Sequence, residues 1–236
     1  MSSFHGFGRE TIDFFLDLRF HNSKAFMDEN RERYLAQVRA PFYALIQALA
    51  PQMEAIDPDF ELRPAKCLSR INRDTRFSRD KSPYRDHLWI AFRQAGRDRD
   101  GQLFYWFELA PEHMNWGLGV WGENRPAMDA MRRRMAARPE DFMQFLRLAA
   151  QRNFSLGGAE WKKLVVPDTL PEELKPWYRK KEIYFGKEGV PLWRMSSPDL
   201  AEQVSRDFAA LAPLYQALRG CVEAAANQLD EQGGKL

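Results

Sequence analysis

The spacing of apolar residues changes twice along this chain of 236 residues, and that change limits the possible folds more than any other feature. Apolar residues first recur at intervals of three to four, then alternate with other residues, and later return to helical intervals. The pattern predicts that the chain is helical in residues 8–55, strand-rich in 64–121, helical in 123–152, irregular in 157–197 and helical in 198–230. It therefore predicts one α+β domain over residues 1–236, with an antiparallel sheet of about four strands and helices from both ends of the chain packed on one face.

Alternation within the middle region fixes which side chains should share a strand face. Leu88, Ile90 and Phe92 should lie on one face, and Trp89 and Arg93 on the other. In this register the three aliphatic and aromatic residues face the helices, and Trp89 faces the basic residues that precede the strand. Further strands are expected at residues 67–72, 103–109, 114–121 and 183–185, with a polar turn at 97–101.

Prolines indicate where helices should break or begin. Pro41 lies within the helical apolar set of the first region and should kink or split that helix. Pro139 should restart the chain between two helices, and the sequence Ser197-Pro198-Asp199 is a strong helix start, with serine as the N-cap.

Composition excludes several classes of protein. The content of 17 Phe, 7 Trp and 7 Tyr excludes a wholly disordered chain, and apolar runs of at most five residues exclude a membrane-spanning helix. The near balance of 35 basic and 33 acidic residues does not fit a protein whose whole surface binds nucleic acid. No secretory signal is visible, so we expect a soluble, cytoplasmic protein.

The cysteines and histidines give no sign of a metal centre. Cys67 and Cys221 lie in apolar surroundings and are expected to be buried thiols in a reducing compartment. The four histidines are not spaced as metal ligands, so we expect no metal and no cofactor.

The highest density of charged residues lies in residues 70–86, called here the basic loop. Its 17 residues contain six cations and three aspartates, for a local charge of +3. Arginine has a planar guanidinium that matches phosphate and carboxylate oxygens in pairs, so several arginines on one loop can converge on an anion. Because the loop cannot neutralise its own charge, it is the first candidate for an anion-binding site.

Residues 70–85, RINRDTRFSRDKSPYR, resemble the signature of an uncharacterised bacterial and fungal family known as domain of unknown function 2461. The resemblance continues through Phe7, Phe15, Leu16, Asn22, Arg31, Tyr34, Pro41 and Phe42 upstream, and through residues 117–121 downstream. The family usually has two asparagines where this chain has His21-Asn22, and an aromatic pair beginning with tryptophan where it has Ala25-Phe26. No activity is established for the family, so the resemblance implies none here.

The leading hypothesis is binding or turnover of an anionic small molecule at the basic loop. The expected ligand-binding residues are Arg70, Arg73, Arg76, Lys81, Arg85 and Trp89. If the protein is an enzyme, Asp74 is the candidate for proton transfer and Tyr84 for orienting the ligand. A guanidinium over the Trp89 ring would form a cation–π contact, and such a face would suit a nucleotide-like ligand with a flat ring and a negative group.

Two alternatives remain open at this point. The protein could be a nucleic-acid-binding module in which the basic loop joins residues 132–134 and 179–181 in one basic stripe. It could instead be a structural protein whose basic loop is an internal network of ion pairs. By themselves, residues 132–134 are most simply the solvated face of an amphipathic helix, and residues 179–181 are most simply cations that pack beside aromatic side chains.

A pair of glycines, Gly117 and Gly119, falls on one face of the strand expected at 114–121. Because glycine has no side chain, another part of the protein or a ligand can come close to this face of the strand. We expect a packed helix there, and a ligand is the alternative.

Overall fold

The computed structural model describes residues 4–96, 101–120 and 122–233, and for residues 227–233 it describes the backbone alone. Residues 97–100 of the expected polar turn and Trp121 of the expected third strand therefore lie outside the described residues.

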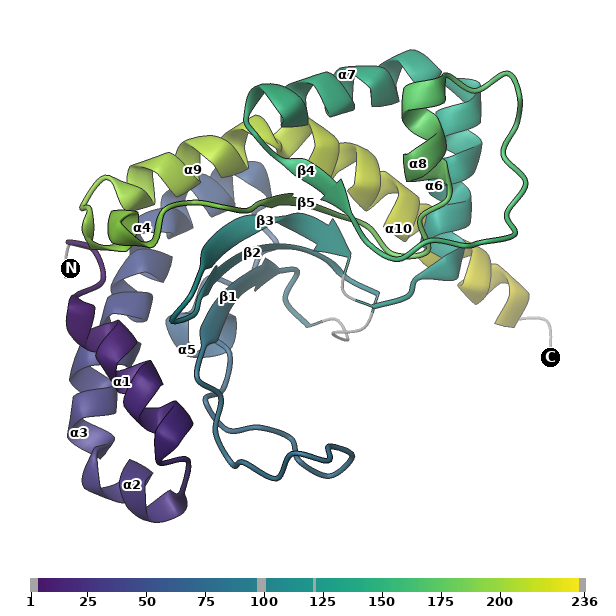
Figure 1. Ribbon diagram of the computed structural model, residues 1–236. Coiled ribbons are helices and arrows are strands. Elements are labelled where there is room, and N and C mark those ends of the chain that lie inside the picture. The colour runs from purple at the N-terminus through teal and green to yellow at the C-terminus, as the bar shows by residue number, and fades with distance from the viewer. Residues whose placement is uncertain (1–3, 97–100, 121, 234–236) are drawn as a thin grey trace. The chain divides into compact units, whose positions relative to one another are not determined.

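Helices occupy both the first and the last parts of the chain (Figure 1). They are α1 (Arg9–Phe20), α2 (Lys24–Glu29), α3 (Arg31–Arg33), α4 (Ala40–Ile56), α5 (Pro64–Cys67), α6 (Arg125–Ala137), α7 (Pro139–Gln151), α8 (Lys175–Tyr178), α9 (Leu200–Ala210) and α10 (Ala212–Gly233), with a π-helical segment at Tyr34–Arg39 and 3₁₀ turns at Glu172–Leu174 and Leu192–Ser196. The expected break at Pro139 is confirmed. The hydroxyl of Ser197 accepts a hydrogen bond from the Asp199 N–H at 3.2 Å, close to the start of α9.

The strands form a sheet of five, so the expectation of an α+β fold is confirmed. They are β1 (Leu88–Arg93), β2 (Leu103–Leu109), β3 (Met114–Val120), β4 (Ser155–Gly157) and β5 (Tyr184–Lys187), in the order β1-β2-β3-β5-β4. Strands β4 and β5 are antiparallel, with Leu156 opposite Phe185. The sequence did not predict β4, because three residues are too few to show an alternating pattern.

Strand β1 has the expected register. Leu88, Ile90 and Phe92 are fully buried, whereas Trp89 and Arg93 are only partly covered. Alternation of side chains across the strand explains both sets.

The strand expected at residues 67–72 is absent, which corrects the prediction. Cys67 ends helix α5, and only isolated bridges, Leu68–Ile90 and Asn72–Tyr84, join this segment to its neighbour. The N–H of Ser69 donates to the Trp89 carbonyl at 2.8 Å, and the N–H of Trp89 donates to the side-chain oxygen of Ser69 at 3.0 Å. A side chain thus supplies one contact that a backbone carbonyl would supply in a continuous ladder.

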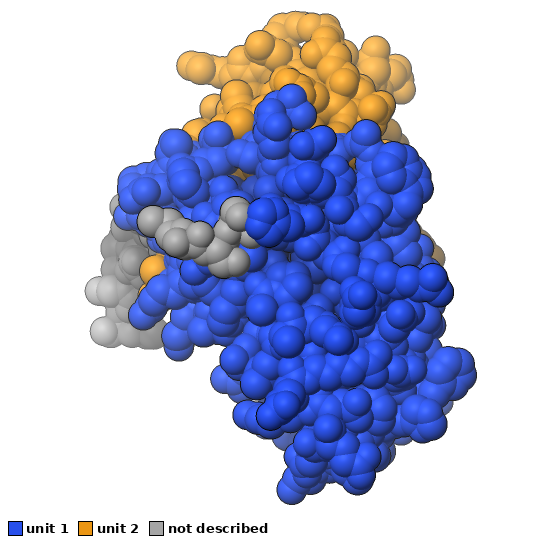
Figure 2. Space-filling model, turned by 90° about the vertical axis from the view of Figure 1, so that its left-hand side faces the viewer, with its two compact units in different colours: residues 1–92, 106–116, 188–206 blue, residues 93–105, 117–187, 207–236 orange. Residues whose placement is uncertain are grey.

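The chain divides into two compact units, which Figure 2 shows in two colours. Unit 1 comprises residues 1–92, 106–116 and 188–206, and unit 2 comprises residues 93–105, 117–187 and 207–236. Strands β2 and β3 contribute residues to both units.

Each unit has its own aromatic core against β2. In unit 1, the Phe107 ring stacks on Phe7 with centroids 5.9 Å apart and meets Phe42 of α4 edge-on at 6.4 Å. In unit 2, the Tyr105 ring lies 4.8 Å from Phe208 and 5.5 Å from Tyr215. Helices from the first and last parts of the chain thus pack against β2 residues, α4 within unit 1 and α9 and α10 within unit 2.

The helical run from α3 to α4 changes its geometry just before Pro41. Proline has no N–H and cannot donate to the carbonyl of Gln37, four residues earlier. The buried hydroxyl of Thr11 on α1 donates to that carbonyl instead, at 2.6 Å. The run is π-helical through Arg39 and becomes α-helical at Ala40, so Pro41 marks a change of helix type where a kink or split was expected.

Gly119 permits a close approach in unit 2, but the neighbour is neither a helix nor a ligand. A Cβ atom at Gly119 would lie 2.6 Å from the Cβ of Tyr184 and 2.8 Å from the carbonyl oxygen of Ile183. The glycine therefore makes room for strand β5, which corrects the expectation of a packed helix.

Candidate functional site

The basic loop is anchored at its base, within unit 1. The N–H of Arg73 donates to the carbonyl of Pro83, and the N–H of Arg85 donates to the carbonyl of Ile71, both at 2.8 Å. The side-chain amide of Asn22 donates to the Tyr84 carbonyl at 2.9 Å and accepts from the Tyr84 N–H at 3.0 Å. Asn22 thus holds the base of the loop against the segment between α1 and α2. The rest of the loop extends away from the start of β1 (Figure 1).

Within the loop, several expected ligand-binding cations bind loop residues. Arg73 forms an ion pair with Asp80, Arg76 forms one with Asp74 at 2.7 Å, and the Lys81 ammonium donates to the Thr75 carbonyl at 2.9 Å. These contacts favour the hypothesis of an internal network for this part of the loop.

The carboxyl of Asp74 has the wrong acidity for a proton donor. The side-chain hydrogen bonds from Arg76, helped by that residue's N–H, lower the pKa of Asp74 to about 2. A carboxyl with so low a pKa is ionised and weakly basic near neutral pH, which argues against the proton-transfer role that the sequence suggested for it.

Arg85 is held by backbone carbonyls and by a ring. Its Nη1 donates to the carbonyls of Arg70 at 2.8 Å and Asn72 at 2.6 Å, and its guanidinium lies over the Trp89 ring. The expected cation–π contact with Trp89 is therefore present, and Arg85 is its cation.

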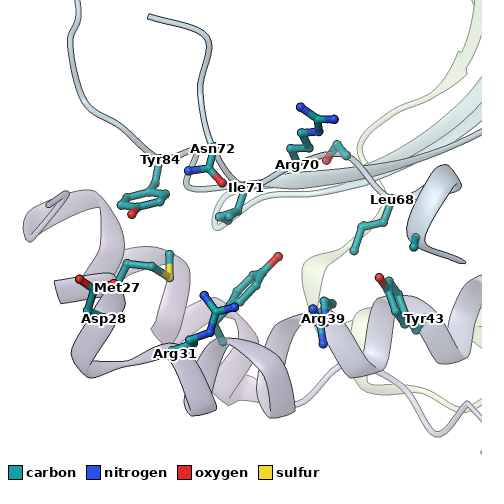
Figure 3. Close-up of a pocket in the computed structure, with 13 residues that line it drawn as sticks. Met27, Asp28, Arg31, Arg39, Tyr43, Leu68, Arg70, Ile71, Asn72 and Tyr84 are labelled. Carbon is teal, nitrogen blue, oxygen red and sulfur yellow. The ribbon is translucent and has the colours of Figure 1, made fainter. Parts of the chain in front are cut away.

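A pocket of about 320 Å³ in unit 1, called here the arginine pocket, lies beside the base of the loop. Figure 3 shows its two sides. The helical side carries Met27, Asp28, Arg31, Arg39 and Tyr43, and the facing side carries Leu68, Arg70, Ile71, Asn72 and Tyr84.

Apolar and aromatic side chains form part of the lining of the arginine pocket. Met27, Ile71 and Tyr84 are buried, with Tyr84 only 8% exposed. Tyr34 also lines the pocket, and burial raises the pKa of its phenol, so Tyr34 remains a neutral hydrogen-bonding group near neutral pH. Rings with polar ends suit a ligand that is partly flat and apolar.

Cations exceed carboxylates around this pocket. Arg31, Arg39 and Arg70 line it, and Asp28 is the acidic residue among its lining side chains. None of the three arginines forms an ion pair with a residue in the described part of the chain, although Arg39 lies over the Tyr43 ring at 5.6 Å. In Figure 3 the Arg70 guanidinium points away from the helical side, so Arg70 belongs to the rim.

The sequence did not single out Arg31 and Arg39 as ligand-binding residues. Both belong to a helical run, where charged residues usually indicate a solvated face. They become pocket residues because Leu68 and Ile71, which lie some 30 residues or more further along the chain, cover that face. The one signal available was that the family resemblance includes Arg31 and Tyr34.

A second cavity of about 660 Å³, called here the loop cavity, lies within unit 1 against the basic loop. Arg73, Asp74 and Arg85 line the loop cavity, Arg70 lines the arginine pocket, and Tyr84 lines both. Arg76, Lys81 and Trp89 line neither of these two cavities. The structure therefore divides the predicted site residues between two places.

Arg132 in unit 2 is 6% exposed, which corrects its expected place on a solvated helix face. Its guanidinium donates to the Tyr178 and Lys180 carbonyls and pairs with Asp129 at 2.7 Å. Arg132 lies four residues after Met128, on the buried face of α6, and its role there is to satisfy carbonyls of the irregular segment.

The neighbouring cations also form contacts within unit 2. Arg134 donates to the Ala217 carbonyl at 3.0 Å. Lys180 pairs with Glu160 at 2.8 Å, and Lys181 pairs with Glu123 at 2.9 Å. These pairings reduce the number of cations that a nucleic-acid backbone could use, and nucleic-acid binding stays a prediction.

No group of three or more histidine, cysteine, aspartate or glutamate residues in the described part of the chain is arranged to hold a metal ion. No helix there is long and apolar enough to span a membrane.

The chain matches a protein-family model. The family model described as "Conserved hypothetical protein (DUF2461)" matches residues 10–216, which is most of the chain. No curated protein matches it.

Proposed function

Because the chain belongs to the DUF2461 family of conserved hypothetical proteins, whose description names no activity, we propose a function from the site itself: the protein binds an anionic small molecule in the arginine pocket. The proposal keeps the ligand class expected from the sequence. It moves the centre of the site from the basic loop to the pocket at the base of that loop.

One observation carries this proposal: three arginines and only one acidic residue, an aspartate, are among the described residues that line a pocket with buried apolar and aromatic side chains. A guanidinium without a carboxylate partner remains available for the oxygens of a phosphate or carboxylate. Arg31 and Arg39 on the helical side, with Arg70 at the rim, provide this excess of positive charge.

The π-helical segment supports the proposal. Segments of π-helix are rare and occur frequently at functional sites. This one supplies two lining residues, Tyr34 and Arg39, and the Thr11 hydroxyl satisfies a carbonyl within it. The geometry that places Arg39 is thus built from two segments far apart in the sequence.

The pocket's interior favours a ligand with a flat ring. The phenols of Tyr34, Tyr43 and Tyr84 lie beside Met27, Leu68 and Ile71. A volume of about 320 Å³ is at the lower end of the range for small-molecule sites. A nucleotide-like molecule with one phosphate combines the ring and the charge in that size.

Isothermal titration calorimetry with adenosine monophosphate tests the proposal. Arg31→Gln and Arg39→Gln should each weaken binding about tenfold or more, since a hydrogen bond to a charged group contributes ~1.5–3 kcal/mol. Arg76→Gln is the matched control, because it removes the same charge from an exposed loop position outside the pocket. Adenosine and inorganic phosphate, titrated separately, measure what the ring and the anion each contribute.

Either of two results would contradict the proposal. The first is no heat of binding for adenosine monophosphate or phosphate at millimolar concentration. The second is binding that Arg76→Gln weakens as much as Arg39→Gln does, which would return the site to the basic loop.

A structural role for the basic loop remains the second candidate. The ion pairs of Arg73 with Asp80 and of Arg76 with Asp74 favour it. A cytoplasmic location also belongs to the proposal, and it is supported by Cys67 and Cys221, which are buried free thiols.

A further inference from the structure

The loop cavity contains a histidine that is oriented by a carboxylate. Nδ1 of His87 lies 3.0 Å from Oδ1 of Asp86. When Nδ1 carries the proton of that hydrogen bond, Nε2 carries the lone pair and can accept a proton. His87 lines the loop cavity, and its side chain is 35% exposed.

A second contact, at Oδ2, holds the Asp86 carboxylate in place. Oδ2 accepts a hydrogen bond from Nε of Arg19 at 2.5 Å, and Nη2 of Arg19 donates to Glu112 at 3.0 Å. Burial raises the pKa of Asp86, but the hydrogen bonds from His87 and Arg19 outweigh it, and the net pKa lies below its usual value. Asp86 therefore remains an anion beside the imidazole.

The His87 ring is held from a second direction. It stacks on the Trp89 ring with centroids 5.9 Å apart and planes at 27°. A hydrogen bond at one nitrogen and a ring contact on one face together restrict the rotation of the imidazole. An oriented base whose partner is oriented in turn is the arrangement that proton transfer requires.

Charges in this cavity balance, unlike those around the arginine pocket. Arg19, Arg73 and Arg85 line it together with Asp74, Asp80 and Asp86. A cavity with equal numbers of the two charges does not favour an anion over a neutral molecule. Its polar lining suits a small polar substrate without net charge.

We propose that the loop cavity is a second site, in which His87 accepts a proton from water during the hydrolysis of small neutral carboxylic esters. The water oxygen forms a bond to the carbonyl carbon as its proton moves to Nε2 of His87. The bond between that carbon and the alcohol oxygen then breaks, and the imidazolium returns the proton to the leaving alkoxide. One water and one ester become one acid and one alcohol, and His87 is left unchanged.

The probe is 4-nitrophenyl acetate, with the anionic ester mono-4-nitrophenyl adipate as its charged counterpart. His87→Gln should lower the protein-catalysed rate about a hundredfold, in the range for loss of a general base. His113→Gln is the matched control: His113 also pairs with a carboxylate, Glu108, at 2.7 Å, but it lines neither of the two cavities. The control should keep the wild-type rate, and the neutral ester should react at least as fast as the anionic one.

Asp86→Asn tests the positioning role separately. It should lower kcat about tenfold with KM unchanged, because substrate binding remains while the imidazole loses its orienting partner. Circular dichroism and thermal unfolding of each variant show whether it is folded. In the wild-type protein, 4-nitrobenzyl acetate, a second small neutral ester, should compete with 4-nitrophenyl acetate and lower the rate at which 4-nitrophenol is released.

Three results would overturn the inference: a wild-type rate equal to that of buffer, equal losses in His87→Gln and His113→Gln, or a strong preference for the anionic ester. None of them concerns the arginine pocket, so the proposed binding of an anion stands or falls on its own titrations.

Discussion

The guanidinium carbon of Arg85 lies 5.0 Å from the centroid of the Trp89 ring. Arg85 precedes β1 by three residues, and Trp89 is the second residue of that strand. His87 lies between them in sequence and also stacks on Trp89. The contact joins the base of the basic loop to the first strand of the sheet.

Arg85→Gln should destabilise the protein by ~1–3 kcal/mol, because the Arg70 and Asn72 carbonyls lose a charged donor. Urea unfolding followed by tryptophan fluorescence measures the change. Arg76→Gln, which breaks an exposed ion pair, should leave the midpoint unchanged. Equal effects of the two substitutions would contradict the anchoring role of Arg85.

Asn22→Ala should lower the free energy of unfolding by ~1–3 kcal/mol, because it removes both hydrogen bonds to the Tyr84 backbone. Asn22→Asp keeps the acceptor for the Tyr84 N–H but places a second acceptor against the Tyr84 carbonyl. It should therefore also destabilise the protein. Hydrogen exchange at the Tyr84 amide should be faster in both variants, and an unchanged rate would show that Asn22 does not hold the loop.

Gly119→Ala should cost ~1–3 kcal/mol or more, because the added Cβ would lie 2.6 Å from the Tyr184 Cβ. Gly220→Ala in α10 is the control, since its Cβ would find an ordinary contact at 3.7 Å from Arg134. A glycine within a helix costs ~0.5–1 kcal/mol relative to alanine, so Gly220→Ala should stabilise the protein. Thermal unfolding of the two variants should give shifts of opposite sign, and shifts of the same sign would refute the packing assigned to β5.

Acid should destabilise the wild-type protein more than the Glu61→Gln variant. The side-chain hydrogen bonds from Arg63 lower the pKa of Glu61 from 4.5 to about 2. A carboxyl with a lowered pKa in the folded state stabilises that state above pH 4.5 and loses this contribution as the pH falls towards 2. Urea midpoints at pH 5 and pH 2.5 measure the loss, with Glu54→Gln, an exposed substitution on α4, as the control. A loss in Glu61→Gln as large as in the wild type would contradict this ionisation.

The sheet could be predicted where local patterns determine structure. Strands β1, β2 and β3 alternate over six or seven residues each, which is long enough to show their period. The segment at residues 67–72 has the composition of a strand, but a single side chain, Ser69, takes the place of a backbone partner. Such a substitution of partners is not visible in a hydrophobic pattern.

The candidate site was harder to predict because its parts come from distant segments. The basic loop was recognisable from its charge, but its excess of cations did not show which of them pair with the loop's own aspartates. Arg31 and Arg39 look like solvated helix residues until the segment after α5 covers them. Arg132 could have been placed correctly from its spacing to Met128 alone.

Tyr84 lines both the arginine pocket and the loop cavity. A ligand that displaces this ring from one side must change the free energy of a molecule bound on the other. Such a coupling is reciprocal: whatever factor the first ligand imposes on the affinity of the second, the second imposes on the first. Anion binding in the arginine pocket and ester binding in the loop cavity would then be thermodynamically coupled through the Tyr84 ring.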